Sequence, residues 1–147
     1  NIPYKFNLLY RASRDGNTPA AFHAKCYNEG PTIVIVKISN SEKLVGGYNP
    51  FKWDSSNQDK STKDSYIYLF TDRIDTKSAK VSYSEGDNYS IRNLVSHGPG
   101  FGGGSDLIEY LDSKWYSYPS NSYPKIDGIP TGGFNVDDYE VFQVIKK

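Results

Sequence analysis

The stretch TIVIVKI, residues Thr32–Ile38, constrains the fold more strongly than any other part of the sequence. Its β-branched residues favour a strand over a helix, and no polar residue alternates with them before Lys37. Apolar residues at successive positions are typical of a strand that is covered on both faces, so we expect this strand at the centre of a sheet. The segment KLVGGYN, residues 43–49, follows as its antiparallel neighbour, and its paired glycines indicate a bulge or a close approach between backbones.

Further strands are predicted along the rest of the chain. The run YIYLF, Tyr66–Phe70, is one, and the shorter candidates are Lys80–Tyr83 and Ser90–Val95. The segment DYEVFQVI, residues 138–145, predicts a closing strand that is apolar along nearly its whole length. Thirteen tyrosines, seven phenylalanines and two tryptophans also favour a sheet structure over a small helical bundle.

The clearest helix signal is NTPAAFHAKCYNEGP. Thr18 can cap the first amides, Pro19 suits the first helical position, and the closing Gly-Pro pair ends the helix. Phe22 and Cys26 then share one helical face. Together these features predict a mainly β (α+β) protein, an antiparallel two-sheet β-sandwich flanked by a few short helices. We expect roughly six to nine short strands within a single domain over residues 1–147.

Composition excludes several classes of partner. Seventeen Lys and Arg residues balance seventeen Asp and Glu residues, so no net charge favours nucleic acid or an anionic membrane. The sequence has no apolar run of the about 18 residues that membrane insertion requires. The single cysteine, Cys26, suits a reducing compartment and predicts a cytoplasmic location. The chain begins at Asn1 and contains no methionine, which indicates a piece of a longer multidomain polypeptide.

Two long segments are predicted to be loops. Residues 54–64, DSSNQDKSTKD, are polar without an apolar period, and we expect an exposed loop with solvated carboxylates. Residues 116–133, YSYPSNSYPKIDGIPTGG, are too broken by proline and glycine for regular structure. We expect this second segment to be a surface loop that packs through its tyrosines.

The stretch HGPGFGGGSDL, residues 97–107, places five glycines within residues 98–104 and includes the spacing G-x-G-x-x-G. A dinucleotide site would also need a long helix after the glycines and an acidic residue about 20 positions downstream. No Asp or Glu stands between Asp112 and Asp127, and no Lys-Ser or Lys-Thr pair closes the run as in a P-loop. We therefore interpret the glycines as a bulged, tightly packed turn between strands.

No catalytic or metal-binding residues are predicted. Ser13, Asp15 and His23 supply the residue types of a hydrolase triad, but no nucleophile elbow accompanies them. Zinc needs three or four protein ligands, whereas His23 and Cys26 have only His97 as a further candidate. Cys26 lacks a resolving thiol for peroxide chemistry, which favours a role as a small buried helix residue.

Five blocks stand in order along the chain: LLYRASRDG with the helix and strand after it, GGYNPFKW at 46–53, YLF at 68–70, GPGFGGGSDL at 98–107, and YEVFQV at 139–144. In this order and spacing they resemble the TLDc domain family, from its N-terminal signature to its closing strand with an internal Glu. One departure is Val45, where many members carry an aromatic residue before the paired glycines. The resemblance covers nearly the whole chain.

The resemblance implies a β-sandwich flanked by helices, without a cofactor, in proteins that protect cells against oxidative stress. Several members bind the vacuolar proton-pumping ATPase and alter its assembly, and the domain is often joined to other modules. For this chain the resemblance therefore implies a protein partner and possible attachment to further domains.

Glu140 interrupts an otherwise apolar strand, and a buried carboxylate needs hydrogen-bonded partners. One interpretation is a structural ion pair with Arg11 or Arg14. The other is a protein-binding face in which Glu140 reaches solvent beside the glycine block. The candidate interaction residues are Ser13, Asp15, Gly16, Gly100, Phe101, Gly102, Gly103 and Glu140.

The main functional hypothesis is a non-catalytic protein-interaction domain that takes part in oxidative-stress protection and in regulation of the vacuolar proton-pumping ATPase. The alternative is a carbohydrate-binding, lectin-like sandwich in which Trp53, Trp115 and the loop tyrosines provide stacking platforms for sugar rings. A third hypothesis is an antioxidant enzyme that uses the thiol of Cys26.

Overall fold

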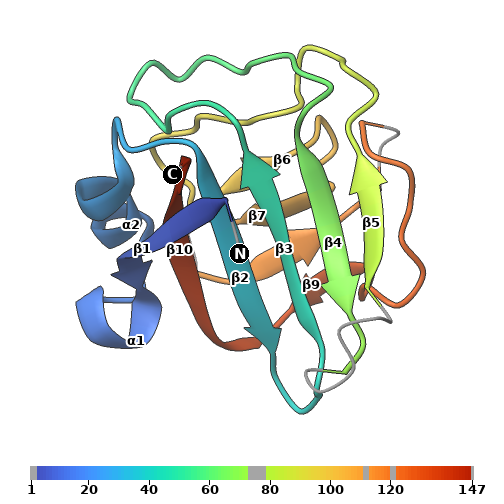
Figure 1. Cartoon of the computed structure of the whole chain (residues 1–147). Coiled ribbons are helices and arrows are strands. Elements are labelled where there is room, and N and C mark those ends of the chain that lie inside the picture. Colours follow the sequence, from blue (N-terminus) through green and yellow to red (C-terminus); the bar gives the residue numbers. More distant parts are fainter. Residues whose placement is uncertain (1–2, 73–78, 111–112, 120–121, 147) are drawn as a thin grey trace.

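The computed structural model describes residues 3–72, 79–110, 113–119 and 122–146 (Figure 1). Two antiparallel sheets pack face to face, one with six strands and one with four, and two short helices lie at the edge of the larger sheet. The fold is therefore the predicted mainly β sandwich. The described residues contain ten strands, slightly more than the sequence suggested.

The larger sheet joins both ends of the chain. Its strand order is β1-β10-β2-β3-β4-β5, so the first and last strands are neighbours. All of its neighbouring strands are antiparallel. The bounds are β1 Tyr4–Arg11, β2 Thr32–Ile38, β3 Leu44–Asn49, β4 Tyr66–Phe70, β5 Lys80–Tyr83 and β10 Val136–Lys146.

The smaller sheet is built from very short strands in the order β6-β7-β8-β9. Their bounds are β6 Gly100–Phe101, β7 Leu107–Glu109, β8 Trp115–Ser117 and β9 Gly132–Phe134. The glycine-rich stretch thus supplies the first strand of this sheet. Part of residues 116–133 also belongs to the sheet, so the prediction that this whole segment is a loop was wrong.

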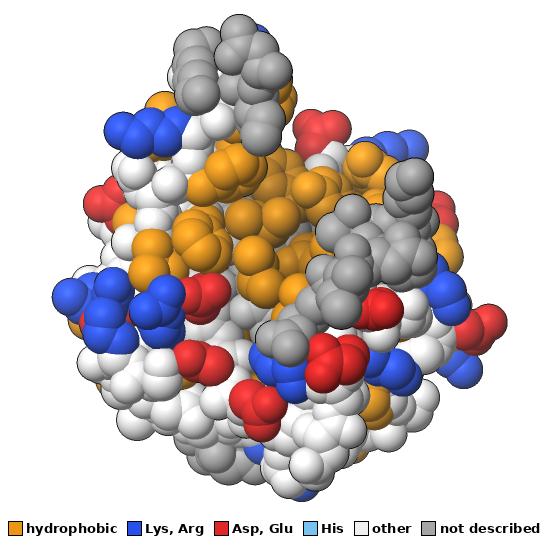
Figure 2. All heavy atoms as spheres, turned by 60° about the horizontal axis from the view of Figure 1, so that its bottom comes forward, with side chains coloured by type: hydrophobic (Ala, Val, Ile, Leu, Met, Phe, Trp, Pro, Cys, Tyr) orange, Lys and Arg blue, Asp and Glu red, His pale blue; other side chains and the backbone are white. Residues whose placement is uncertain are grey.

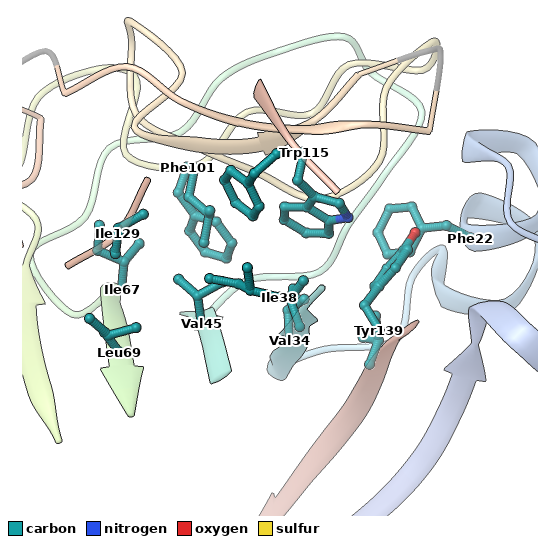
Figure 3. Close-up of a cluster of buried hydrophobic side chains, with 14 of the residues drawn as sticks. Phe22, Val34, Ile38, Val45, Ile67, Leu69, Phe101, Trp115, Ile129 and Tyr139 are labelled. Carbon is teal, nitrogen blue, oxygen red and sulfur yellow. The ribbon is translucent and has the colours of Figure 1, made fainter. Parts of the chain in front are cut away.

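The core fills the space between the two sheets (Figure 3). The ring of Phe101 from β6 packs edge-on against Trp53, with ring centroids 5.9 Å apart. Trp115 from β8 meets Tyr139 from β10 with centroids 5.1 Å apart. The Trp115–Tyr139 pair connects the two sheets, and the preferred edge-to-face geometry of both pairs orients the rings in the core.

The helix prediction was confirmed at its start and on its buried face. Helix α2 spans Pro19–Cys26, and the Thr18 side chain accepts a hydrogen bond from the amide of Ala21 at 3.1 Å. Phe22 and Cys26 are both fully buried. A second, four-residue helix, α1, spans Ala12–Asp15 directly after β1. No described helix has the length and apolar character to cross a membrane.

Strand β2 is central, as predicted, but it is covered on only one face. Val34 and Val36 are fully buried, whereas Ile33 and Ile35 between them are half-buried. The smaller sheet covers only the inner side of β2, and the helices lie beyond the sheet edge (Figure 1). The prediction of burial on both faces was therefore wrong, because apolar residues here occupy a solvent-facing side as well.

The paired glycines in β3 serve close approach, not a bulge. The β2–β3 register runs without a shift past both of them. A side chain at Gly46 would collide with the Val34 carbonyl and the Tyr68 hydroxyl, and one at Gly47 would meet the ring of Phe101. Glycine is thus required at both positions, because other groups of the protein occupy the space that a side chain would need.

Two other local predictions need correction. The segment Ser90–Val95 is not a strand, because it contributes only isolated bridges, Lys60 with Ile91 and Arg92 with Gly100. The loop at 54–64 is largely exposed, but its carboxylates are not simply solvated. Asp54 pairs with Lys60 at 2.8 Å, and Asp59 pairs with Arg92 at 2.9 Å.

Candidate functional site

Arg11 organises a group of polar side chains at the end of β1. Its Nε and Nη2 atoms donate to Oε2 of Glu140 at 2.7 and 2.6 Å, across the β1–β10 pairing. Its backbone amide donates to Oδ2 of Asp15 at 2.9 Å. The two acidic candidates, from opposite ends of the sequence, are thereby linked through one arginine.

The neighbouring helix α1 adds two further contacts. The amide and hydroxyl of Ser13 donate to the carboxylate of Asp138 at 3.0 and 2.6 Å. Arg14 donates to both carboxylate oxygens of Asp15 at 2.9 and 2.8 Å. These bonds from Arg14, together with that from the Arg11 amide, lower the pKa of Asp15 to about 2. We call Arg11, Ser13, Arg14, Asp15, Asp138 and Glu140 the polar cluster.

Gly16 ends helix α1 and belongs to the same region. Its φ of 108° lies in the range that favours glycine, and its carbonyl accepts a hydrogen bond from the Tyr10 hydroxyl at 2.7 Å. Burial raises the pKa of Tyr10 to about 12, so this hydroxyl remains a donor. The structure thus brings Ser13, Asp15, Gly16 and Glu140 together.

The glycine block lies elsewhere. Phe101 is fully buried between the sheets, with its ring over Gly47 and beside Trp53. Glu140 pairs with Ile35 on the opposite, solvent-facing side of the larger sheet. The expected neighbourhood of Glu140 and the glycine block is therefore wrong, because the larger sheet separates them.

The amides of the glycine block are already used within the fold. The Gly98 amide donates to the Glu109 carbonyl at 2.9 Å, and the Gly102 amide donates to the Tyr89 carbonyl at 3.0 Å. The Gly103 amide donates to the Ser122 hydroxyl at 2.9 Å. A phosphate cradle needs such amides to point at the ligand, so this arrangement favours the structural interpretation.

Gly102 has the strictest local requirement in the block. Its φ is 95°, and a side chain there would collide with the carboxylate of Asp106. Its carbonyl, with that of Gly103, faces the Arg92 guanidinium at 3.4 and 3.1 Å. Gly100 and Gly102 are buried and Gly103 is exposed. The block therefore positions the smaller sheet and offers little surface to a partner.

The residue types of a hydrolase triad have separate partners. Ser13 bonds to Asp138, Asp15 to the two arginines, and His23 Nε2 lies 2.6 Å from the His97 carbonyl. No group of three or more potential metal-ligating side chains occurs within the described part of the chain. Cys26 is fully buried, and burial raises the pKa of its thiol to about 12. A thiol with that pKa is almost entirely protonated at neutral pH, which argues against peroxide chemistry.

A buried carboxylate that the sequence did not single out lies in β7. Glu109 is fully buried, and its Oε1 accepts a hydrogen bond from the Tyr139 hydroxyl at 2.7 Å. Burial is also the main reason that the pKa of Tyr139 is raised well above its ordinary value. Gly98 leaves the space that this carboxylate occupies. The sequence contained an indication of this buried carboxylate, because Glu109 directly follows the apolar pair Leu107-Ile108.

The solvent-facing side of the larger sheet, here called the outer face, is strongly apolar (Figure 2). Directly paired residues share a face of the sheet, and Ile33, Tyr48, Tyr66 and Tyr83 pair in sequence from β2 to β5. Phe6, Val81 and Tyr83 are 50%, 52% and 58% exposed. Exposed apolar surface of this extent is typical of an interaction site.

Two tyrosines of the outer face, Tyr48 and Tyr83, differ from the core tyrosines in their hydroxyl groups, whereas the Tyr68 hydroxyl donates to the Val34 carbonyl at 2.7 Å. The core hydroxyls of Tyr10, Tyr123 and Tyr139 donate to carbonyl or carboxylate oxygens. Within the described residues, the hydroxyls of Tyr48 and Tyr83 make no hydrogen bond. These two rings thus keep a polar end that is open to a binding partner.

The two tryptophans expected in a carbohydrate-binding platform are not accessible, whereas the loop tyrosine Tyr118 is 45% exposed. Trp53 and Trp115 are 1% and 0% exposed, so neither ring can stack on a sugar. The Nε1 atom of Trp53 donates a hydrogen bond to the Thr32 hydroxyl at 2.9 Å, so the polar atom of this buried ring has a partner within the fold. The prediction that these two tryptophans form a binding surface was therefore wrong.

The family model of the TLDc domain matches residues 2–145 of this chain. A search of curated proteins returned no match. The matched range includes every strand and both helices described above, except for the last residue of β10.

Proposed function

We propose that this chain, which belongs to the TLDc domain family, is a non-catalytic protein-interaction domain in the protection of cells against oxidative stress. We further propose that it acts in the cytoplasm, without a cofactor, and that its partner is the vacuolar proton-pumping ATPase. The family is linked to oxidative-stress resistance, which supports the first part of the proposal.

The observation that carries the proposal is the apolar outer face of the larger sheet. Ile33 and Ile35 of β2, Tyr66 of β4 and Tyr83 of β5 lie there, at positions where a solvated antiparallel sheet normally has polar residues. A partner that covers these side chains would gain free energy in proportion to the apolar area removed from water. The buried, protonated thiol of Cys26 supports binding over thiol catalysis as the basis of protection.

Co-sedimentation with purified vacuolar ATPase tests the proposal directly. We expect the domain to sediment with the ATPase and to change the fraction of assembled enzyme. Tyr83→Ser should reduce both effects, because Tyr83 is 58% exposed on the outer face. Tyr118→Ser, at a ring that is 45% exposed outside that face, is the matched control.

A parallel assay measures survival of cells under hydrogen peroxide. The wild-type domain should protect the cells, and Tyr83→Ser should protect them less at an equal protein level. If the domain neither sediments with the ATPase nor protects cells, the proposed function is wrong. If it protects without binding the ATPase, the partner is wrong and the protective role remains.

A further inference from the structure

Three adjoining hollows form a continuous trough along the outer face. The first is a space of about 430 Å³ with Ile33 in its lining, and the second, of about 360 Å³, includes both Ile33 and Ile35. The third continues from Ile35 to Glu140. The trough therefore follows strand β2 from the aromatic rings to the polar cluster.

The trough is concave because its floor and its walls differ in size. Ile33 and Val144 from the central strands lie in the floor of the first hollow, and Phe6 from β1 stands on one side. The rings of Tyr48 and Tyr66 stand on the other side, stacked with centroids 5.4 Å apart. A rounded element therefore fits this surface better than a second flat sheet.

Each end of the trough carries a carboxylate. Asp64 lines the first hollow and Asp138 lines the third, and within the described residues neither forms an ion pair. Glu140 and Lys37 also line the third hollow, but each already has an oppositely charged neighbour, Arg11 and Asp137. The charges left unbalanced along the trough are thus negative.

The spacing of these carboxylates suits one helix. Asp138 pairs with Lys37, and Asp64 precedes Tyr66, which lies in the cross-strand row of Ile33. The Lys37 and Ile33 rows are four residue steps apart along the strand axis, about 13 Å, and Asp64 lies beyond the Ile33 row in the bend before β4. The two carboxylates also lie on strands three spacings apart, β10 and the start of β4, so about 14 Å separates them across the sheet. A helix of about 13 to 15 residues that crosses the strands at an angle is long enough to reach both ends.

We propose that the trough binds a basic amphipathic α-helix of a protein partner, with its apolar stripe on Ile33 and Ile35 and cationic residues near Asp64 and Asp138. This inference rests on the proposed interaction function and specifies the class of partner. The charges argue against a second copy of the chain, since two copies of this face would bring carboxylates toward carboxylates. They also distinguish the basic helix from an acidic helix of the same shape.

The test uses three synthetic peptides of about 15 residues. One is an amphipathic helix with Lys near both ends, the second has Glu in place of each Lys, and the third has the composition of the first in scrambled order. Calorimetry measures binding to the whole chain. We expect saturable one-to-one binding of the basic helix alone, weakened by added salt.

Variants locate the binding site. Tyr83→Ser and Asp64→Lys should each weaken binding of the basic helix about tenfold. The controls Tyr118→Ser and Asp127→Lys, at exposed positions outside the trough, should leave it unchanged. Thermal melts verify that each variant is folded.

Several results would overturn the inference. Equal binding of the acidic or scrambled peptide would exclude recognition of a basic amphipathic helix. Equal effects of the trough and control variants would place binding elsewhere. Sedimentation that shows a dimer lost in Tyr83→Ser would make a second copy the occupant.

If the ATPase and protection assays succeed while the basic peptide fails to bind, only the helix inference is wrong. Peptide binding with neither ATPase sedimentation nor protection would leave the inference standing and remove the proposed function.

Discussion

The Arg11–Glu140 ion pair should stabilise the fold only modestly, although its geometry is good. Two guanidinium nitrogens lie 2.7 and 2.6 Å from Oε2 of Glu140, but the side chains are 42% and 27% exposed. Water screens an attraction between groups with that much exposure, so Glu140→Gln should lower the free energy of unfolding by about 0.5 to 1 kcal/mol. A fully buried pair would lose about 3 to 5 kcal/mol on removal of one partner.

Urea denaturation of the wild type and Glu140→Gln measures this difference, because urea adds no ionic strength that would screen the pair. A change of 1 kcal/mol corresponds to about 2 to 4 °C in the melting temperature of a domain of this size. Arg11→Gln and the double variant complete a cycle, and we expect a coupling energy below about 1 kcal/mol. Asp127→Asn, at an exposed position away from the polar cluster, controls for the change of net charge. A loss above about 2 kcal/mol with matching coupling would refute the argument from exposure.

Four further predictions concern Gly102, nucleotide binding by the glycine block, His23 and Cys26. Gly102→Val should cost about 2 to 3 kcal/mol in guanidinium denaturation, because the φ of 95° and the carboxylate of Asp106 both oppose a side chain. Calorimetry with ATP and NAD should detect no saturable binding to the wild type, and a clear isotherm would contradict the structural interpretation of the glycines. Burial lowers the pKa of His23 below its ordinary 6.5, and its Nδ1 is buried without a partner in the described structure. The stability that neutral His23 provides should be complete above pH 6.5 and be lost as the pH falls through the folded-state pKa. When the free energy of unfolding is measured against pH, His23→Gln should not show this loss of stability below pH 6.5. The same pH dependence in the variant as in the wild type would exclude His23 as the cause of the loss. Cys26→Ala should retain full protection of cells against peroxide at equal protein level, since the thiol pKa of about 12 leaves almost no thiolate, and loss of protection would show that the thiol takes part.

Features that depend on neighbours in the sequence were predictable. The cap at Thr18, the buried pair Phe22 and Cys26, and the strand at Tyr66–Phe70 all follow from residue type and local spacing. The strands of the smaller sheet were not predictable in the same way. Strand β6 has only two residues, Gly100 and Phe101, and it forms because β7 pairs with it. Such short elements carry no periodic signal and depend on tertiary contacts.

The candidate site was predictable only in part, for a related reason. Ser13 and Asp15 adjoin Arg11 in sequence, and the strand pairing brings Glu140 to the same arginine. Phe101 has the same residue type whether it is buried or exposed, and only the packing against Gly47 shows that it belongs to the core. Residue type in a single sequence does not distinguish these two environments.

The same limit explains why the apolar outer face was missed in the sequence. Val34 and Val36 point into the core, while Ile33 and Ile35 point to solvent, so a run without polar alternation occurs in a strand with one covered face. Threonine at Ile33 or Ile35 would keep the β-branched shape and leave less apolar surface in water. Isoleucine at these positions therefore adds less to the stability of the isolated domain than it would add to the stability of a complex. In a complex, each Å² of apolar surface removed from water contributes about 25 cal/mol. The residues that suggested a doubly covered strand are thus the ones that a partner helix would cover.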